Sequence, residues 1–321
     1  MNFKIKKISG DASFRDFYRI QKNNNSSIIV LAKKNPYKNL VVYCAVNKIL
    51  NSNKVLAPKL INTFKQNNII EISDLGRVSF IEYIKSKKNK IKPYKKIINL
   101  ILKIQKIKLN TNYKYKKNKI KFKKYSRKML HQESDLFFDW YLKHTIKKKI
   151  LFKIKAKIKQ ELNNIYKKLH YKNNYFVHRD FHASNIMVSN EKLGVIDSQD
   201  AIIGNPLYDI ASLIDDVRIK LPKNLKDNLL KHYMLKSKFR VKKEYFYLKN
   251  DFDILSVQRN LKILGIFVRL YKRDNKKSYL KYLPYTWSLI ERRMKNPIFN
   301  QLNILFKKNL PIQKLKKIKK I

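Results

Sequence analysis

One run of this sequence, FVHRDFHASNIMVSNEKLGVID at 176–197, constrains the fold more than any other feature. It opens on an apolar dipeptide, reaches Asp180 within a His-Arg-Asp triplet, and places Asn185 five positions later. β-like segments on both sides of the turn residues 189–192 predict a tight hairpin, and Asp197 follows its second strand. A five-residue loop followed by such a hairpin can return Asn185 and Asp197 to the side of the chain where Asp180 lies.

This order of side chains suits phosphoryl transfer. The reaction needs one carboxylate that accepts or orients the proton of the attacking hydroxyl. It also needs an amide oxygen and a second carboxylate that hold Mg²⁺ against the nucleotide phosphates. Each residue is ordinary by itself, because a His-Arg-Asp triplet occurs by chance and an aspartate at a strand end is often a turn residue. Their order around a predicted hairpin favours the catalytic interpretation.

The spacing of hydrophobic residues changes along the rest of the chain. Up to residue 73 the spacing is typical of short strands. It predicts a hairpin over 14–32, strands over 58–64 and 68–72, and one helix over 40–50. From about residue 75 the period becomes helical. Helices are predicted over 79–86, 93–107, 134–143, 153–170, 207–218, 225–233, 254–271 and 283–294.

We therefore expect an α+β, bilobal fold, since 321 residues allow about two domains. The smaller lobe, 1–73, is β-rich with one main helix, and the larger lobe, 74–321, is helical and carries the catalytic hairpin. Two lysine-rich segments are ambiguous. The segment 113–128 is a single-strand-binding surface or, as its composition favours, a solvated loop or poorly ordered connection. The segment 307–321 is a membrane-surface helix or, preferably, a docked or frayed terminal helix.

Charge is the most extreme feature of the composition. The 75 Lys and Arg residues against 22 Asp and Glu leave a formal net charge of +53, which suggests a nucleic-acid partner. Only 12 of the 75 are arginine, however, and phosphate or base recognition favours the planar guanidinium. The lysine excess accompanies abundant Asn, Ile and Tyr, whose codons are AT-rich. We attribute it to genome composition and expect no specific nucleic-acid partner.

Other features of the sequence bear on location. No apolar stretch approaches the roughly 20 residues of a membrane-spanning helix, and the N-terminus has no apolar signal region. The single cysteine, Cys44, cannot form an internal disulfide. We expect a cytoplasmic protein without a transmembrane segment and, although the sequence does not determine the oligomeric state, a monomer.

The catalytic run resembles that of a known superfamily. Its His-x-Asp-x4-Asn spacing and the later aspartate are similar to the aminoglycoside phosphotransferase and choline kinase-like branch of the protein-kinase-like fold. Two further stretches, SGDASFRDFYR at 9–19 and GVIDSQDA at 194–201, resemble the bacterial N-acetylmuramate/N-acetylglucosamine anomeric sugar kinases. The segments 131–142 and 258–267 are similar to that subfamily as well. The resemblance spans nearly the whole chain.

The resemblance implies roles for the catalytic run, with ATP and Mg²⁺ as cofactors. Asp180 would be the catalytic base, and Asn185 and Asp197 would hold Mg²⁺. His178 would be a buried organiser of the loop. Asp209, at the start of an apolar helix, would brace the loop, although an acid is favourable in the first turn of any helix.

The resemblance also implies a nucleotide site in the N-terminal lobe. A turn would place backbone N–H groups over the phosphates. Its residues are Gly10, Ala12, Ser13 and Phe14. The connection between the lobes would consist of Glu71, Ile72 and Ser73. Backbone groups of these residues would form hydrogen bonds with the adenine edge.

The phosphate-contacting lysine is where this sequence departs from protein kinases. Lys33 follows a predicted strand and is a candidate, with a merely solvated lysine as the alternative. No Asp or Glu occurs between Asp16 and Glu71, so the usual Lys–Glu pair of protein kinases cannot form from this lobe.

Four further residues are candidates for contact with the acceptor. The guanidinium of Arg259 would match the lactyl carboxylate of a muramic acid. Glu133 and Asp135 would take hydroxyls of a pyranose, and Gln199 would be a further substrate contact. A surface ion pair is the ordinary alternative for each charged residue in this set.

These inferences lead to an ATP-dependent phosphotransferase that acts on a small-molecule hydroxyl. The favoured acceptor is the anomeric hydroxyl of N-acetylmuramate or N-acetylglucosamine, in cell-wall amino-sugar recycling. About a dozen residues separate Asp197 from Asp209, which leaves no room for the long activation loop of a protein kinase. An aminoglycoside or choline-like acceptor is the alternative within enzymes. A basic nucleic-acid or membrane-surface binding protein with vestigial kinase residues is the alternative from another class.

Overall fold

The computed structural model describes residues 3–8, 15–23, 25–32, 37–238 and 242–316. The chain forms two compact units, of which the first is Met1–Lys123 with Tyr175–Ile203 and the second is Lys124–Asn174 with Gly204–Ile321. The α+β class is confirmed, because a sheet forms the N-terminal part and helices dominate the C-terminal part. The lobe boundary between residues 73 and 74 stays a prediction. Among the described residues, every helix is too short or too polar to span a bilayer.

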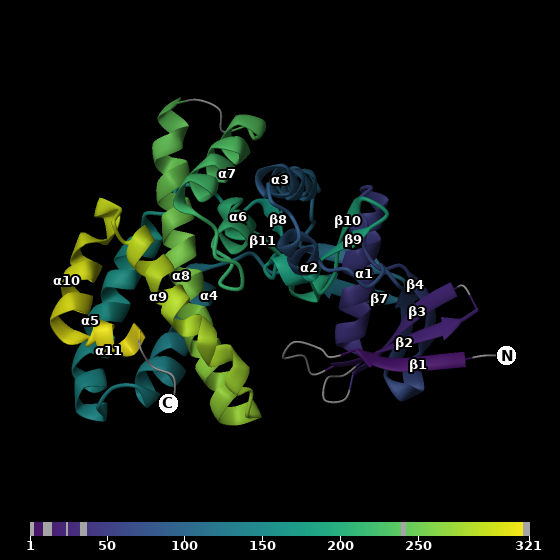
Figure 1. The fold of residues 1–321 in the computed structure, drawn as a ribbon, viewed down its shortest axis with the longest axis horizontal. Coiled ribbons are helices and arrows are strands. Elements are labelled where there is room, and N and C mark those ends of the chain that lie inside the picture. Colours follow the sequence, from purple (N-terminus) through teal and green to yellow (C-terminus); the bar gives the residue numbers. More distant parts are fainter. Residues whose placement is uncertain (1–2, 9–14, 24, 33–36, 239–241, 317–321) are drawn as a thin grey trace. The chain divides into compact units, whose positions relative to one another are not determined.

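The first unit is built on an antiparallel sheet (Figure 1). The sheet has five strands in the order β1-β2-β3-β5-β4. Its strands are β1 (Phe3–Ile8), β2 (Arg15–Lys22), β3 (Asn25–Ala32), β4 (Leu60–Phe64) and β5 (Ile69–Ser73). The predicted hairpin over 14–32 is confirmed as β2 and β3. On β3, Ile28, Val30 and Ala32 are buried, which is the two-residue period of a strand with one covered face. The predicted helix over 40–50 is α1 (Lys38–Ser52).

The other elements of this unit support the catalytic run. The helices are α2 (Phe80–Lys85) and α3 (Ile91–Gln105), and the strands are β8 (Tyr175–Val177), β9 (Ile186–Ser189), β10 (Lys192–Val195) and β11 (Ile202–Gly204). β9 and β10 form the predicted catalytic hairpin, and β8 pairs with β11. A capping box between Ser79 and Glu82 starts α2, since each side chain bonds a backbone N–H at the other's position.

The lysine-rich segment 113–128 contains a hairpin, so the expectation of a solvated loop was wrong. β6 (Asn112–Tyr115) and β7 (Asn118–Lys121) pair antiparallel. Tyr115 and Ile120 are buried between exposed lysines. The expectation failed because alternation of apolar residues with lysine is also the period of a strand with one buried face.

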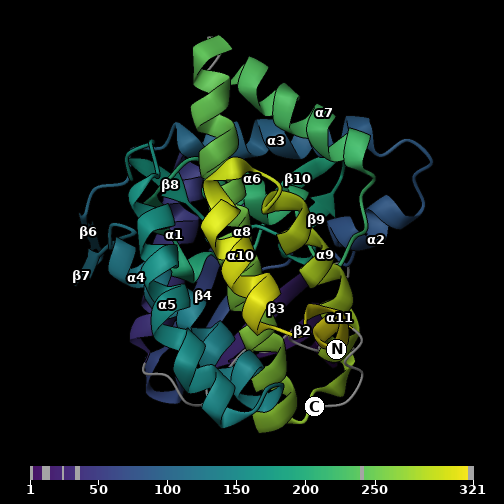
Figure 2. The same ribbon diagram turned by 90° about the vertical axis from the view of Figure 1, so that its left-hand side faces the viewer.

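The second unit is helical. Its helices are α4 (Arg127–Leu136), α5 (Lys148–Lys167), α6 (Leu207–Ile214), α7 (Lys223–Lys236), α8 (Lys242–Asp274), α9 (Leu283–Arg293), α10 (Asn300–Asn309) and α11 (Ile312–Lys316). The 33-residue α8 runs the length of the unit, and α4, α6 and α9 pack against it (Figures 1 and 2). The helices predicted over 153–170, 207–218, 225–233, 254–271 and 283–294 are present with other bounds, and α10 was not predicted. The helix predicted over 134–143 is α-helical only at its start, because α4 ends at Leu136 and Phe137–Tyr141 is π-helical. The hydroxyl of Tyr141 donates to the carbonyl of the buried Leu315 at 3.0 Å, so the terminal helix is docked as far as it is described.

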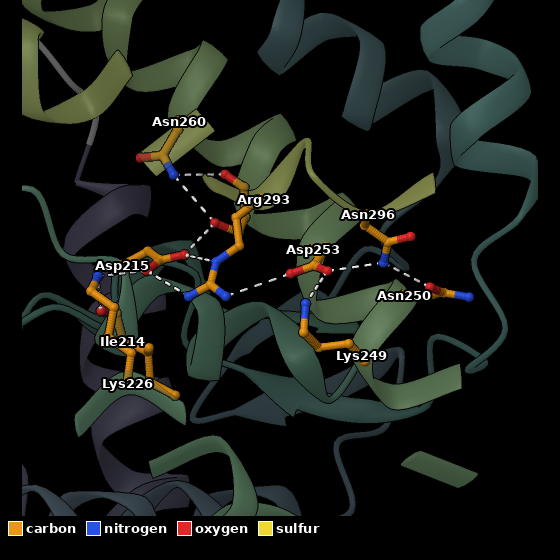
Figure 3. Close-up of polar contacts among 10 residues, drawn as sticks. Ile214, Asp215, Lys226, Lys249, Asn250, Asp253, Asn260, Arg293 and Asn296 are labelled. Carbon is orange, nitrogen blue, oxygen red and sulfur yellow. Dashed lines mark hydrogen bonds and ion pairs between the residues drawn. The ribbon is translucent and has the colours of Figure 1, made fainter. Parts of the chain in front are cut away.

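A buried group of charges, here called the Asp215 cluster, lies in this unit (Figure 3). The Asp215 carboxylate accepts hydrogen bonds from Nε of Arg293 at 2.7 Å, Nζ of Lys226 at 2.7 Å and the hydroxyl of Ser256 at 2.6 Å. α6 ends at Ile214 and not at the predicted residue 218, and Asp215 is its C-cap residue. Burial by itself would raise the pKa of Asp215, but Arg293 and Lys226 hold it well below its usual range.

Gly265 marks the close approach of α8 to α4. A Cβ atom at this position would overlap the backbone carbonyl of Leu136, the last residue of α4. Backbone cannot move aside as a flexible side chain does, so Gly265→Ala should destabilise the protein by about 1–3 kcal/mol. Urea unfolding measures the change. Lys272→Ala, at an exposed position of the same helix, is the control and should stay within about 0.5 kcal/mol of the parent. Equal stability of the two variants would contradict the close contact.

Candidate active site

The loop after β8 is held in shape by its own hydrogen bonds. The N–H of His182 donates to the carbonyl of Asp180 at 3.0 Å, and the N–H of Asn185 donates to the carbonyl of His182 at 2.9 Å. The side-chain nitrogen of Asn185 donates back to the carbonyl of Asp180 at 3.0 Å. Arg179 has a φ of 75°, in the left-handed region that a non-glycine residue occupies at a cost. These bonds set the position of Asp180.

The β9–β10 hairpin brings Asp197 to the same loop. Ile196 donates its N–H to the carbonyl of Asn185 at 3.0 Å, and its own carbonyl lies 3.0 Å from Nε2 of His178. Asp197 follows at a φ of 63°, again left-handed. Asp180, Asn185 and Asp197 therefore meet around one loop. His178 is fully buried, as the resemblance implies, and its organising role stays a prediction.

Arg15, at the start of β2, also reaches this site and was not predicted. Its Nη2 donates to Oδ1 of Asp197 at 2.7 Å, and its Nη1 donates to Oε1 of Gln199 at 2.9 Å. Gln199 completes a triangle by donating to Oδ1 of Asp197 at 3.1 Å. The guanidinium lies 5.8 Å from the ring centre of Phe17 and 5.7 Å from that of Tyr43. The signal for Arg15 in the sequence was its place inside the run at 9–19. The predicted contact of Gln199 with substrate stays a prediction.

A second contact joins the site to α1. The hydroxyl of Ser198 donates to Oδ1 of Asn47 at 2.7 Å, and both side chains are buried. Tyr43 lies one turn earlier on α1, where burial raises the pKa of its hydroxyl and a hydrogen bond with Asn47 opposes that rise. At this site α1 contributes an amide and no carboxylate, which agrees with the lack of acidic residues between Asp16 and Glu71.

The Asp197 carboxyl is subject to opposing influences. Loss of hydration raises its pKa, the guanidinium of Arg15 lowers it, and the carboxylate of Asp180 raises it again, with a net rise above the ordinary value. The Asp197 side chain is 33% exposed, so a cation can still approach it. A divalent cation is favourable here because it removes the repulsion between the two carboxylates.

The donor set at this loop suits Mg²⁺. Mg²⁺ takes oxygen ligands and keeps several waters, so a few protein ligands suffice. Both side-chain hydrogen bonds that Asn185 makes with described residues use its nitrogen, which leaves its oxygen for a cation. Within the residues that the structure describes, no three or more His, Cys, Asp or Glu side chains gather as a metal cluster. A cation here would therefore depend on Asn185, Asp197 and the phosphates of a nucleotide.

The predicted nucleotide contacts fall in two groups. The residues of the first group lie outside the described part of the chain: Gly10, Ala12, Ser13, Phe14 and Lys33. The second group, Glu71, Ile72 and Ser73, ends β5. The Glu71 carboxylate accepts hydrogen bonds from Ser27 at 2.6 Å and Asn62 at 2.7 Å, and Ile72 is buried. The side chains of Glu71 and Ile72 therefore stabilise the sheet. The hydrogen bonds predicted between adenine and the backbone of residues 71–73 stay a prediction.

Glu133, a predicted acceptor contact, is buried on α4 at the centre of a hydrogen-bond network. Its Oε2 accepts from the hydroxyls of Tyr125 at 2.5 Å and Tyr208 at 3.2 Å, and from Nε2 of Gln258 at 3.1 Å. Its Oε1 pairs with Nζ of Lys262 at 3.1 Å. A sugar hydroxyl would have to replace one of these partners.

The remaining predicted residues of the second unit differ in their surroundings. Asp135 pairs with Lys159 at 2.8 Å. Arg259, on α8, is 5% exposed, and its Nη1 has no hydrogen-bond partner among the described residues. A buried guanidinium nitrogen without a partner is costly, so an anion that reached Arg259 would be stabilised there. Asp209 is buried in the first turn of α6, and its bracing role stays a prediction.

Comparison with known sequences confirms the resemblance. A profile of the phosphotransferase enzyme family matches residues 94–242. The N-acetylmuramate/N-acetylglucosamine kinase of Pseudomonas aeruginosa is 26% identical over 286 residues, which are 88% of this chain and 81% of that protein. The N-acetylmuramate/N-acetylglucosamine kinase of Neisseria meningitidis serogroup B is 24% identical over 91% of this chain and 86% of that protein.

Comparison with solved structures confirms the fold. A choline/ethanolamine kinase family protein from Mesorhizobium loti matches with a TM-score of 0.62 and 13% identity, over 95% of this chain and 92% of that one. An ADP-bound aminoglycoside phosphotransferase matches with a TM-score of 0.60 and 15% identity, over 90% of this chain and 92% of that one. Likeness at this identity establishes the protein-kinase-like fold that the sequence predicted.

Proposed function

We propose that this chain, a phosphotransferase by its sequence and its fold, transfers the γ-phosphoryl group of ATP to the anomeric hydroxyl of N-acetylmuramate or N-acetylglucosamine. The observation that carries the proposal is the meeting of Asp180, Asn185 and Asp197 around one hydrogen-bonded loop. The relatives named for these two sugars suggest the acceptor. Such an activity would serve the recycling of cell-wall amino sugars.

Each side chain of the loop has its own task in this reaction. The Asp180 carboxylate accepts a hydrogen bond from the anomeric hydroxyl and takes its proton as the oxygen attacks. A bond forms between that oxygen and the γ-phosphorus, and the bond from the γ-phosphorus to the bridging oxygen breaks, which releases ADP. The oxygens of Asn185 and Asp197 would hold Mg²⁺, which neutralises charge on the phosphates.

The charges of the second unit favour a neutral or anionic acceptor over a cationic one. Aminoglycosides and choline-like amines are cations, and the acidic residues of the segment 133–139 are the group that would attract them. Each of the three is already paired with a lysine: Glu133 with Lys262, Asp135 with Lys159, and Asp139 with Lys155. A cationic acceptor would have to displace a lysine from each. The buried guanidinium of Arg259 would match the carboxylate of N-acetylmuramate.

An assay of the purified full-length protein tests the proposal. ATP and Mg²⁺ are supplied with N-acetylmuramate, N-acetylglucosamine, glucose, choline or kanamycin, and ADP release is followed, with phosphorus NMR of the product. We expect turnover with the two amino sugars and a product signal from an anomeric phosphate. Turnover with choline or kanamycin alone would refute the sugar acceptor, and so would the absence of turnover with both amino sugars in a protein that ATP stabilises against heat.

A further inference from the structure

The contacts of Arg15 bear directly on the carboxylate that would bind a metal ion. Oδ1 of Asp197 accepts hydrogen bonds from Arg15 at 2.7 Å and from Gln199 at 3.1 Å. A carboxylate oxygen has two lone pairs, so these two donors saturate it. A cation that binds through Oδ1 must displace a donor, and one that binds through Oδ2 lies close to a guanidinium of the same sign.

The guanidinium is well placed to remain at Asp197. Its side chain is 10% exposed and lies near the rings of Phe17 and Tyr43. Its planar fork reaches Asp197 and Gln199 with separate nitrogens, which the single ammonium of a lysine would do less well. The ion pair between Arg15 and Asp197 is therefore held in place by the surrounding side chains.

We infer that Arg15 is a positioning residue that competes with the divalent cation for Asp197 until a nucleotide binds. The inference rests on the proposed function, since that function supplies the metal and the nucleotide. Arg15 pairs with the carboxylate that would hold the metal ion, so nucleotide phosphates bound to that ion would come near its guanidinium. A phosphate is a strong partner for a guanidinium. Arg15 then passes from the carboxylate to the phosphates, and Asp197 becomes free for the cation. Metal and nucleotide thus bind with positive coupling.

Binding of Mn²⁺ to the full-length protein without nucleotide tests this inference. Free Mn²⁺ is counted by electron paramagnetic resonance, and no acceptor and no turnover are involved. We expect Arg15→Met to bind Mn²⁺ about tenfold more tightly than the parent, which is about 1.4 kcal/mol, because the competing cation is gone. Arg15→Lys should lie between the two. Adding Asp197→Asn to Arg15→Met should abolish the gain, which locates it at this carboxylate.

The matched control is Arg19→Met. Arg19 lies on the same strand, is 14% exposed, and forms a two-bond ion pair with Asp74 at 2.6 and 3.1 Å. Its loss should leave the Mn²⁺ affinity unchanged, whereas a general effect of losing a buried arginine would alter both variants alike. Unchanged or weaker Mn²⁺ binding by folded Arg15→Met and Arg15→Lys would overturn the inference. Because the readout needs no sugar, a failure of the acceptor assay would leave this result standing.

Discussion

Replacing Asp180 by alanine should lower kcat for the amino sugar by about 10²- to 10⁴-fold, the range that a positioned general base contributes. The carboxylate is the group proposed to take the proton of the attacking hydroxyl. The fold should survive, because two bonds that shape the loop are accepted by the backbone carbonyl of Asp180, which alanine retains. Steady-state kinetics at saturating ATP and sugar measure the loss, and the thermal unfolding midpoint checks the fold.

Two further variants sharpen this test. Asp180→Asn keeps the shape of the side chain and removes its basicity, so it should lose turnover to a similar degree. Asp274→Ala removes an aspartate at the end of α8, where the carboxylate pairs with Arg273, and should keep most of its turnover. Near-parental kcat in a folded Asp180→Ala protein would show that Asp180 is not the proton acceptor.

Arg293→Met should destabilise the protein by about 3–5 kcal/mol, the usual cost of removing one partner from a buried ion pair. Arg293 is 4% exposed and donates to both carboxylate oxygens of Asp215, at 2.7 and 3.0 Å (Figure 3). It also lies 3.7 Å from the buried carboxylate of Asp253. Without the guanidinium, Asp215 keeps Lys226 as its counter-ion, but Asp253 loses its second cation. Urea unfolding followed by circular dichroism measures the change.

Lys155→Met is the control for charge removal at the surface. Lys155 pairs with Asp139, and the two side chains are 39% and 52% exposed, so its loss should cost less than about 1 kcal/mol. A triple variant, Arg293→Met with Asp215→Leu and Lys226→Met, should be more stable than Arg293→Met alone, because apolar residues also replace the buried Asp215–Lys226 pair and remove the cost of its desolvation. Equal effects of Arg293→Met and Lys155→Met would show that the Asp215 cluster does not contribute to stability.

The catalytic loop was predictable from the sequence because its geometry is local. Asp180 and Asn185 are five positions apart, and the hairpin that returns Asp197 is announced by two short β-like segments and a turn. The bonds that connect them run between near neighbours in the chain, such as the 3.0 Å bond from Asn185 to the carbonyl of Asp180. Short-range patterns therefore carry this part of the site.

Arg15 was not predicted, although the motif that contains it was noticed. Arg15 and Asp197 are 182 positions apart, and the sequence holds 75 basic residues that can each face a carboxylate. The contact of Asn47 with Ser198 spans 151 positions and has the same difficulty. Neither pair has a spacing that a local period can reveal, since both depend on how the first unit folds.

By itself, this sequence determined the change from a β-rich to a helical part, the catalytic hairpin and the group of residues around Asp180, because hydrophobic period and turn residues act over a few positions. Only the tertiary structure decided which cation faces Asp197 and which cations neutralise Asp215, 78 positions from Arg293. It also revealed that Glu133 is engaged by buried partners and that α8 approaches α4 closely at a glycine. Charge pairing and close packing depend on distances in space, and a chain with many equivalent lysines does not encode those distances in any short pattern.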